Sequence, residues 1–477
     1  MFPFIAIIIA TFILLLACTI VGLPIWYGLI VSFLMFTVLA RKRNHSIKEI
    51  GLMTVGGLKK ASIVVSVFVF IGMLSASWIV SGTVPYLVYY GVQIIHPSVF
   101  YAAAFLLCAL VAFIIGTSFG TVAMVGVMLM AIAVSNNMNI YIASGAIISG
   151  IYFGDRASPM SSSLALLGAM CETEHYANVK MAFKTAIVPG VLTFLAFLAL
   201  SFSSGFEAAA SNTITDDISA EFVISHISLL PIGVILVLCL MKVNVRIAMF
   251  ASSVVAWIVA FFVQSEGIIE LLMVILFGFS LPETSPLTNI IRGGGILNMV
   301  NVAIIVALSC MIAGIIEKVG FIRITAGIEN RDSRVMLFLK TSVAALISAA
   351  VGCNQSIAVI MSPALRKEYY FRAGLSNSEL AKDVSVAAMI IPILIPWNIA
   401  VLVPVTTLGV SGIGYMPFIL FAYLILIWRV FVCRFEDRGE KRLHKIAKIR
   451  EMPLNLMLRS AIIKFGSLCR KKKDRRR

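Results

Sequence analysis

Gly154-Asp-Arg-Ala-Ser-Pro159 is a polar stretch within a chain of 477 residues that is 60% hydrophobic. It combines two charged residues with a helix-breaking proline, and further serines follow at 161 to 163. Inside a bilayer, backbone outside regular helices is tolerated only where it is buried in protein or lines a water-filled cavity. Ionisable residues at membrane depth are costly and mark pathways for ions or solutes. The stretch therefore predicts a transport site within a membrane protein.

The composition supports this interpretation along the whole chain. Only 13% of the residues are charged, and the mean hydropathy is +1.03, whereas soluble domains carry roughly 25% charged residues. A spanning helix needs about 20 mainly apolar residues, and this length rule gives about 12 candidate stretches. We therefore predict an all-α polytopic membrane protein with about 11–14 membrane segments, some of them broken or re-entrant helices.

The net charge of +16 comes largely from loops and from the tail after residue 434. Short loops rich in Lys and Arg face the cytoplasm. We therefore predict both termini on the cytoplasmic side of the membrane, and the acidic loop 203–224 on the outside. No basic residue precedes the first apolar stretch and no convincing cleavage site follows it, so we expect a retained helix.

Several function classes find little support. The eight cysteines show no CxxC spacing, so neither a disulfide framework nor a metal site is expected. No nucleophile–base pair and no phosphate loop is evident, so we predict no enzyme and no cofactor. The expected partners are a small ion or solute and the lipid bilayer, with anionic lipid at the basic tail and no nucleic acid. A homodimer is left open.

The two halves of the chain align weakly when shifted by 236 residues. The segment 109–116 then falls on 345–352, and the polar stretch 154–162 falls opposite 390–398, where two prolines interrupt an apolar run. Loop charge tests this alignment independently. Residues 41–60 carry six Lys or Arg and precede the aligned helix, whereas residues 317–340 carry five and follow it. This reversal predicts an inverted-topology repeat, as found in many secondary transporters.

The predicted domains follow from this repeat. They are 1–59, an N-terminal helix pair with a basic cytoplasmic loop; 60–202, the first inverted repeat; 203–296, the external loop and connecting helices; 297–433, the second inverted repeat; and 434–477, the basic cytoplasmic tail. The apolar stretch 267–282 would make the number of crossings odd, so it is either re-entrant or the segment count is wrong by one.

Four polar interruptions of apolar runs are the predicted sites: 116–121, 154–163, 352–355 and 395–398. Broken helices offer N–H groups to anions and carbonyl groups to cations near the middle of the membrane. The candidate ion- or substrate-binding residues are Thr117, Ser118, Asp155, Ser158, Ser161, Ser162, Asn354, Gln355, Trp397 and Asn398. The candidate structural or coupling residues are Arg156, Pro159, Glu317, Asp383 and Pro396.

Each interruption also has a purely structural interpretation. The first fits a helix contact of small residues, and the third fits amide bonds between helices. In the second, Asp155 and Arg156 would form an ion pair, and the serines would bond to helix carbonyls. In the fourth, Trp397 would be an anchor at the membrane interface.

With these motifs the chain resembles the NhaC-type Na+/H+ antiporter family over residues 60–435. The motifs are Trp78-Ile-Val-Ser-Gly-Thr-Val-Pro85, Tyr89-Tyr-Gly91, Gly116-Thr-Ser-Phe-Gly-Thr121, Phe153-Gly-Asp-Arg-Ala-Ser-Pro159, Gly314-Ile-Ile-Glu-Lys-Val-Gly320 and Ile395-Pro-Trp-Asn398. The resemblance implies a bacterial inner-membrane carrier that exchanges cations, and the family also includes exchangers of small organic acids.

The chain departs from the family pattern at three positions. Ser162 and Asn354 stand where many members have Asp, and Ser385-Val386 stands where an acidic pair is common. Asp155 is the main carboxylate left in a matching motif. The hypothesis is that the scaffold is retained while the coupling or the substrate has changed.

We therefore predict a secondary active transporter, a Na+ (or other monovalent cation)/H+ antiporter that works by alternating access. The alternative is a Na+- or H+-coupled carrier or exchanger of a small organic acid or amino-acid-like solute. A third interpretation, from another class, is a non-transporting sensor or scaffold on a decayed carrier fold.

Overall fold

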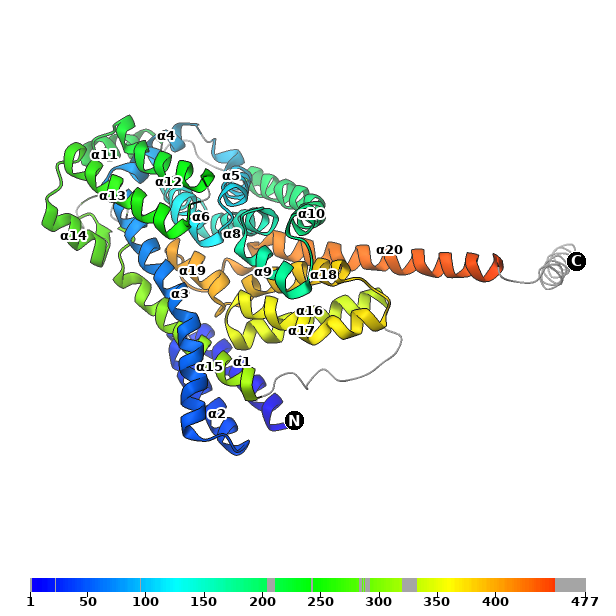
Figure 1. Ribbon diagram of the computed structural model, residues 1–477. Coiled ribbons are helices and arrows are strands. Elements are labelled where there is room, and N and C mark those ends of the chain that lie inside the picture. Colours follow the sequence, from blue (N-terminus) through cyan, green and yellow to red (C-terminus); the bar gives the residue numbers. More distant parts are fainter. Residues whose placement is uncertain are drawn as a thin grey trace, which may run out of the picture.

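The protein is described by a computed structural model that covers residues 2–21, 23–94, 96–203, 211–241, 243–282, 285, 287, 292–319 and 333–450. Within these ranges the chain is almost entirely helical (Figure 1). The helices of the first half are α1 (Phe2–Val21), α2 (Ile25–Lys42), α3 (Ile47–Val80), α4 (Thr83–Ile94), α5 (Phe100–Ile115), α6 (Ser118–Thr121), α7 (Val127–Ser135), α8 (Ile140–Ala157), α9 (Ser162–Cys171), α10 (His175–Ser203) and α11 (Ser211–Glu221).

The helices that follow are α12 (Leu230–Leu240), α13 (Val245–Val263), α14 (Ile268–Phe277), α15 (Val300–Val319), α16 (Arg334–Gly352), α17 (Gln355–Arg372), α18 (Asn377–Ile390), α19 (Ile399–Thr407) and α20 (Leu420–Arg450). Short 3-10 or π turns are η1 (Pro97–Val99), η2 (Val122–Gly126), η4 (His226–Leu229), η5 (Leu297–Met299), η7 (Ile391–Leu394) and η8 (Met416–Phe418). Two short strands, β1 (Phe279–Ser280) and β2 (Arg292–Gly293), pair antiparallel with Phe279 opposite Gly293.

The chain is a multi-pass membrane protein, as predicted. In the part that the structure describes, six helices are long and apolar enough to cross a membrane, and up to nine spans result if each of three bent helix pairs counts as one. One such pair joins 377–394 to 399–407 with a bend of 49°. α14 has only ten residues, which at 1.5 Å per residue is roughly half of a bilayer core. The apolar stretch 267–282 therefore forms no full-length span.

The helices form two groups that we name by their members. The frame bundle contains α1–α3 and α12–α15, in which α3 packs chiefly against α15 and α13, and α15 packs against α2 (Figure 1). The core bundle contains α5–α10 and α16–α20, in which α5 packs against α8, α17 against α16 and α18, and α10 against α20. All four predicted interruptions lie in the core bundle.

Three predicted domain boundaries fall inside continuous helices. α3 runs through position 59/60, α20 runs through position 433/434, and α10 continues for one residue past position 202/203. Ser46 and Glu49 form a capping box at the start of α3, so the second part of the basic segment 41–60 is helical rather than a loop. A change from charged to apolar residues marks where a helix enters the membrane, whereas the capping residues mark where the helix begins.

Glycines allow α5 and α8 to approach closely. A Cβ atom at Gly154 would lie 2.2 Å from the carbonyl oxygen of Ala109, and one at Gly150 would lie 2.3 Å from that of Phe105. Glycines four residues apart permit this backbone contact between membrane helices.

Gly154→Ala is therefore expected to force α5 and α8 apart. Overpacking of this kind costs roughly 1–3 kcal/mol, and the apparent melting temperature of the detergent-purified protein should fall. Gly233→Ala in α12 is the matched control, because among the described residues no atom outside its own helix backbone and its chain neighbours lies within 4 Å of a Cβ at that position. Equal melting temperatures for the two variants would contradict the close α5–α8 contact.

Candidate functional site

All four predicted interruptions are breaks between helices. Left-handed residues follow the last residues of α5 and α16: Gly116 has a φ of 73° and Cys353 has a φ of 48°. The side chain of the next residue then caps the following helix: Thr117 accepts a hydrogen bond from Gly120 N, and Asn354 accepts one from Ser356 N. The two breaks are related by the shift of 236 residues to within one position.

The other two breaks correspond in the same way. After α8, Ser161 caps α9 by accepting from Leu164 N. After η7, Asn398 caps α19 by accepting from Ala400 N. Hydroxyl and amide side chains at N-cap positions satisfy N–H groups that a helix start leaves unpaired. Four of the predicted binding residues, Thr117, Ser161, Asn354 and Asn398, thus shape the breaks themselves.

The breaks contact each other in pairs. A Cβ atom at Gly116 would lie 2.5 Å from the backbone carbon of Met160, so the first and second breaks touch through their backbones. The third and fourth breaks are joined by hydrogen bonds, because Trp397 Nε1 donates to Ala350 O at 2.9 Å and Asn398 Nδ2 donates to Ala349 O at 2.8 Å. These bonds satisfy carbonyl groups at the C-terminal end of α16.

Trp397 is 1% exposed and packs edge-on against Phe12, with 5.0 Å between the ring centroids. The interpretation of this residue as an interfacial anchor is therefore wrong, because an anchor exposes its ring to lipid headgroups and protein covers the ring of Trp397. Gln355 Nε2 donates to Met389 O at 2.8 Å and so links α17 to α18. Of the two amides of the third break, Gln355 therefore forms a bond between helices, whereas Asn354 caps its own helix.

The central group of the site is the carboxylate of Asp155, near the end of α8. Asp155 is 6% exposed, and its Oδ2 accepts a hydrogen bond from the hydroxyl of Ser118 in the first break. The hydroxyl of Ser161 also interacts with it. None of the ion pairs in the described part of the chain includes Asp155. The structure thus brings Ser118, Asp155 and Ser161 together from two breaks.

The predicted ion pair between Asp155 and Arg156 does not form. Arg156 is 1% exposed, and its guanidinium donates to the carbonyl and hydroxyl oxygens of Ser385 at 3.0 and 2.9 Å. It also donates to Ala182 O at 3.0 Å and Thr185 Oγ1 at 2.9 Å in α10. Neighbouring residues on a helix point in different directions, so adjacent charges do not face each other. Arg156 instead joins α8 to α10 and α18.

Arg156→Lys is expected to lower the apparent melting temperature and to slow transport, because an ammonium group cannot reproduce the planar set of donors of a guanidinium. Thr185→Ala removes a single acceptor and should cost only about 1 kcal/mol. Thermal unfolding of both purified variants tests this prediction. An unchanged melting temperature of Arg156→Lys would show that the four hydrogen bonds contribute little to stability.

A second buried carboxylate, Asp383, lies in a cluster of six charged residues. Its Oδ1 lies 2.7 Å from Arg429 Nε, and its Oδ2 accepts from Arg334 and from the hydroxyl of Tyr370. The charge cluster comprises Arg334, Glu379, Lys382, Asp383, Arg429 and Glu436. It holds three positive and three negative charges and joins α16, α18 and α20.

The remaining predicted residues lie around these groups. Ser158 is fully buried and its hydroxyl accepts from Met160 N at 3.1 Å, while Ser162 is exposed in the first turn of α9. The carbonyl of Pro159 lies 2.8 Å from His175 Nε2, and Pro396 is half-buried in the fourth break. The side chain of Glu317 lies outside the described residues. Among the residues described, no group of three or more His, Cys, Asp or Glu is placed to hold a metal ion.

Sequence reasoning missed Arg334 and Arg429, which hold Asp383. Arg334 lies in the segment 317–340, which the loop-charge comparison treats as a loop, although Ser333 caps α16 directly before it. Arg429 stands alone in the apolar run 420–433, and a lone charge within an apolar helix is a signal for a buried partner.

The relatives of the chain are transporters by name. It is 26% identical over 410 residues to the malate-2H(+)/Na(+)-lactate antiporter of Bacillus subtilis, with 85% of this chain and 88% of the relative covered. It is 26% identical to the Na(+)/H(+) antiporter NhaC of Alkalihalophilus pseudofirmus, covering 83% and 87%. It is also 26% identical to the arginine/ornithine antiporter ArcD of Halobacterium salinarum, covering 77% and 80%.

A match to a protein-family profile agrees with these relatives that the chain is similar to antiporters. The matched region contains three of the four breaks. The profile described as the Na+/H+ antiporter family matches residues 150–433, which is more than half of the chain. The match includes Asp155, Arg156 and the whole charge cluster except Glu436. With its broken helices and multiple spans, the chain belongs to the Na+/H+ antiporter family of secondary transporters.

Proposed function

We propose that this protein exchanges Na+, or another monovalent cation, for protons, and that Asp155 binds the two in turn. The observation that carries the proposal is the buried carboxylate of Asp155, which contacts hydroxyl groups and takes part in none of the ion pairs of the described residues.

A buried carboxylate without a cationic partner is costly, because the charge has left water without compensation. A bound proton or a bound cation removes this cost. The two exclude each other at one carboxylate, so the arrival of either displaces the other. This competition is the chemical basis of exchange.

The surroundings of Asp155 supply further oxygen atoms for a cation. The hydroxyls of Ser118 and Ser161 reach the carboxylate from two different breaks. The C-terminal end of α8 adds carbonyl groups with a partial negative charge. Neutral hydroxyls can bind a cation but cannot titrate near neutral pH, so proton coupling depends on Asp155 alone among these three groups.

Alternating access is proposed to come from movement of the core bundle against the frame bundle. All four breaks and both buried carboxylates lie within the core bundle, so the site would move as one body. Rocking of one bundle against another around a fixed site is the usual mechanism in transporters with repeated halves. The correspondence of the breaks, Gly116 with Cys353 and Ser161 with Asn398, supports the proposed inverted repeats at 60–202 and 297–433.

The proposed location is a bacterial inner membrane with both termini in the cytoplasm, because the basic segments 41–60 and 434–477 would then lie inside. The basic tail is proposed to meet anionic lipid there; its side chains from 437 onward lie outside the described residues.

The second candidate function is cation-coupled transport of a small organic acid or amino-acid-like solute. Its support is the neutral residues Ser162, Asn354 and Ser385, together with the names of the Bacillus subtilis and Halobacterium salinarum relatives.

Reconstitution into liposomes with an internal pH dye tests the proposal. Na+, K+ or Li+ is added outside an acid-loaded interior, with the membrane potential clamped. We expect Na+ to make the interior more alkaline, at a rate that differs between the three cations. A flat trace from folded, reconstituted protein would contradict proton exchange and favour the organic-solute candidate.

A further inference from the structure

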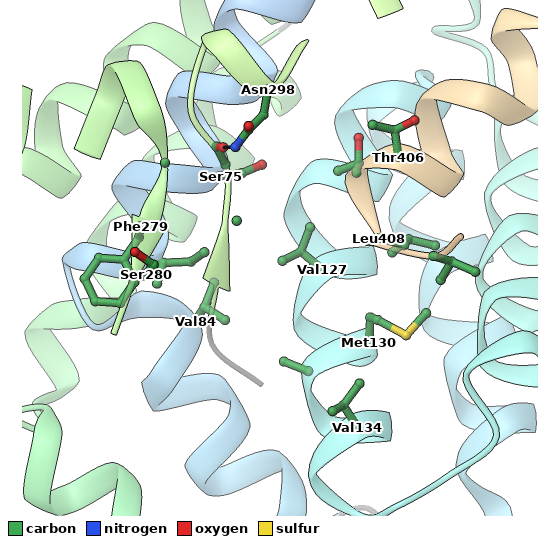
Figure 2. A pocket seen from close by; sticks show the side chains of 18 of the residues that line it. Ser75, Val84, Val127, Met130, Val134, Phe279, Ser280, Asn298, Thr406 and Leu408 are labelled. Carbon is green, nitrogen blue, oxygen red and sulfur yellow. Dashed lines mark hydrogen bonds between the residues drawn. The ribbon is translucent and has the colours of Figure 1, made fainter. Parts of the chain in front are cut away.

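A cavity of about 510 Å³ lies between the frame bundle and the core bundle (Figure 2). One wall consists of Ser75, Ile79 and Val84 together with the hairpin of β1 and β2, and the facing wall consists of α7 and the end of α19. None of the residues predicted from the sequence to bind an ion or substrate lines this interbundle cavity. It is therefore separate from the site around Asp155.

Among the residues that the structure describes, those that line the cavity carry no ionisable side chain. Most of it is apolar, as at Val127, Met130 and Leu408, and the polar side chains are neutral ones from both walls (Figure 2). These are Ser75, Ser280, Asn298, Thr406 and Thr407. Apolar walls with a few fixed polar groups are the usual composition of a site for a small organic molecule.

Two of these hydroxyls, Ser75 Oγ and Thr407 Oγ1, are buried without a hydrogen-bond partner. Ser75 is only 3% exposed. By contrast, Ser77 on the same helix donates to Met73 O and accepts from Trp257 Nε1 at 2.7 Å. Buried polar groups are nearly always paired, so an unpaired hydroxyl at a cavity wall indicates a missing partner. The two hydroxyls belong to opposite walls.

The size and chemistry of the cavity exclude a simple cation site. Its volume equals the liquid volume of roughly 17 water molecules. Cation sites in proteins usually include a negatively charged oxygen among several close oxygen ligands, and the described residues of these walls offer neutral oxygens only. A charged organic molecule would also lack a counter-charge, and burying an unpaired charge is expensive.

We propose that the interbundle cavity binds a small uncharged organic solute whose polar groups bond to Ser75 and Thr407. The proposal goes beyond cation exchange and does not depend on it. The facing wall belongs to helices that start at two of the breaks: α6, η2 and α7 run on from Ser118, and α19 runs on from Asn398. Val127 and Thr406 thus lie roughly 12–14 Å along these helices from the breaks. A solute that bridges both walls would link the frame bundle to the elements that form the ion site.

Cysteine labelling of the full-length protein tests this proposal. Ser75→Cys and Thr407→Cys are each treated with an uncharged reagent, butyl methanethiosulfonate, and with its anionic sulfonatoethyl and cationic trimethylammonioethyl analogues. Intact-mass spectrometry follows the reaction. Ser219→Cys, at an exposed position of α11, gives the intrinsic rate of each reagent, and the unsubstituted chain gives the background of the native cysteines.

After normalisation to Ser219→Cys, we expect both cavity positions to react at least about tenfold faster with the uncharged reagent than with either charged one. The rate should also saturate as reagent concentration rises, because a binding site fills before the thiol reacts. Ser77→Cys, which does not line the cavity, should stay unmodified.

Three results would overturn the proposal. Equal normalised rates for the three reagents would indicate an open aqueous passage. A rate that rises linearly without saturation would indicate exposure without binding. No reaction at either position in folded protein would indicate a closed void. Each readout is independent of cation exchange, so a failure here is distinct from a failure at Asp155.

Discussion

Asp155→Asn is expected to abolish cation-dependent proton exchange in proteoliposomes. The amide has nearly the same shape as the carboxylate, but it can neither release a proton nor balance the charge of a cation. Loss of a buried charged partner costs at least about 3 kcal/mol, which corresponds to a loss of roughly 100-fold in cation affinity. The measurement is the initial rate of the internal pH change after Na+ addition.

Two further variants are measured in the same assay for comparison with Asp155→Asn. Asp216→Asn makes the same chemical change at an exposed position of α11 and should keep the full exchange rate. Ser118→Ala removes the hydroxyl that donates to Asp155, and the cation affinity should fall about tenfold, as expected for one hydrogen bond to a charged group. Full activity of Asp155→Asn in folded protein would mean that protons pass through another group.

Asp383→Ala is expected to cause the largest loss of stability among single substitutions in the core bundle. Asp383 is fully buried, and its removal would leave Arg334 and Arg429, each 3–4% exposed, without their shared carboxylate. Removing one partner of a buried ion pair costs about 3–5 kcal/mol. Thermal unfolding and the yield of monodisperse protein in detergent measure the effect.

Glu368→Ala is the control for this prediction, because Glu368 pairs with Arg372 at the surface, where the two side chains are 70% and 48% exposed. Surface pairs contribute at most about 1 kcal/mol. We expect the folded fraction of Asp383→Asn to retain exchange, since Asp383 is already held by two guanidinium groups and Tyr370. Unchanged stability of Asp383→Ala would show that Glu379 and Glu436 suffice to balance the arginines.

The sequence predicts the helix breaks well, because glycine, proline and capping side chains act locally. Thr117, Ser161, Asn354 and Asn398 interrupt apolar runs, and each of them caps a helix. Asp155 was predictable for a different reason. Burying a carboxylate within an apolar region costs free energy, so such a residue indicates a functional role.

The partners of the buried charges were not predictable in this way. Arg156 bonds to Ser385, which is 229 positions away, and Asp383 bonds to Arg334 and Arg429, which are 49 and 46 positions away. No local pattern encodes such pairs, because they arise only when helices from different parts of the chain pack together. The interbundle cavity was the least predictable feature, because the residues that line it are spread along the sequence from Ser75 to Val410.

The most direct test of the account is the release of protons when Na+ binds to the purified protein. Na+ is titrated into the full-length protein in weakly buffered detergent solution, and a pH indicator records the protons released. Cation binding to a group that must lose its proton releases protons, so we predict release that saturates at about one proton per protein, and none from Asp155→Asn. Saturable Na+ binding without proton release, or equal release from Asp155→Asn, would contradict the proposal that one carboxylate binds both ions in turn.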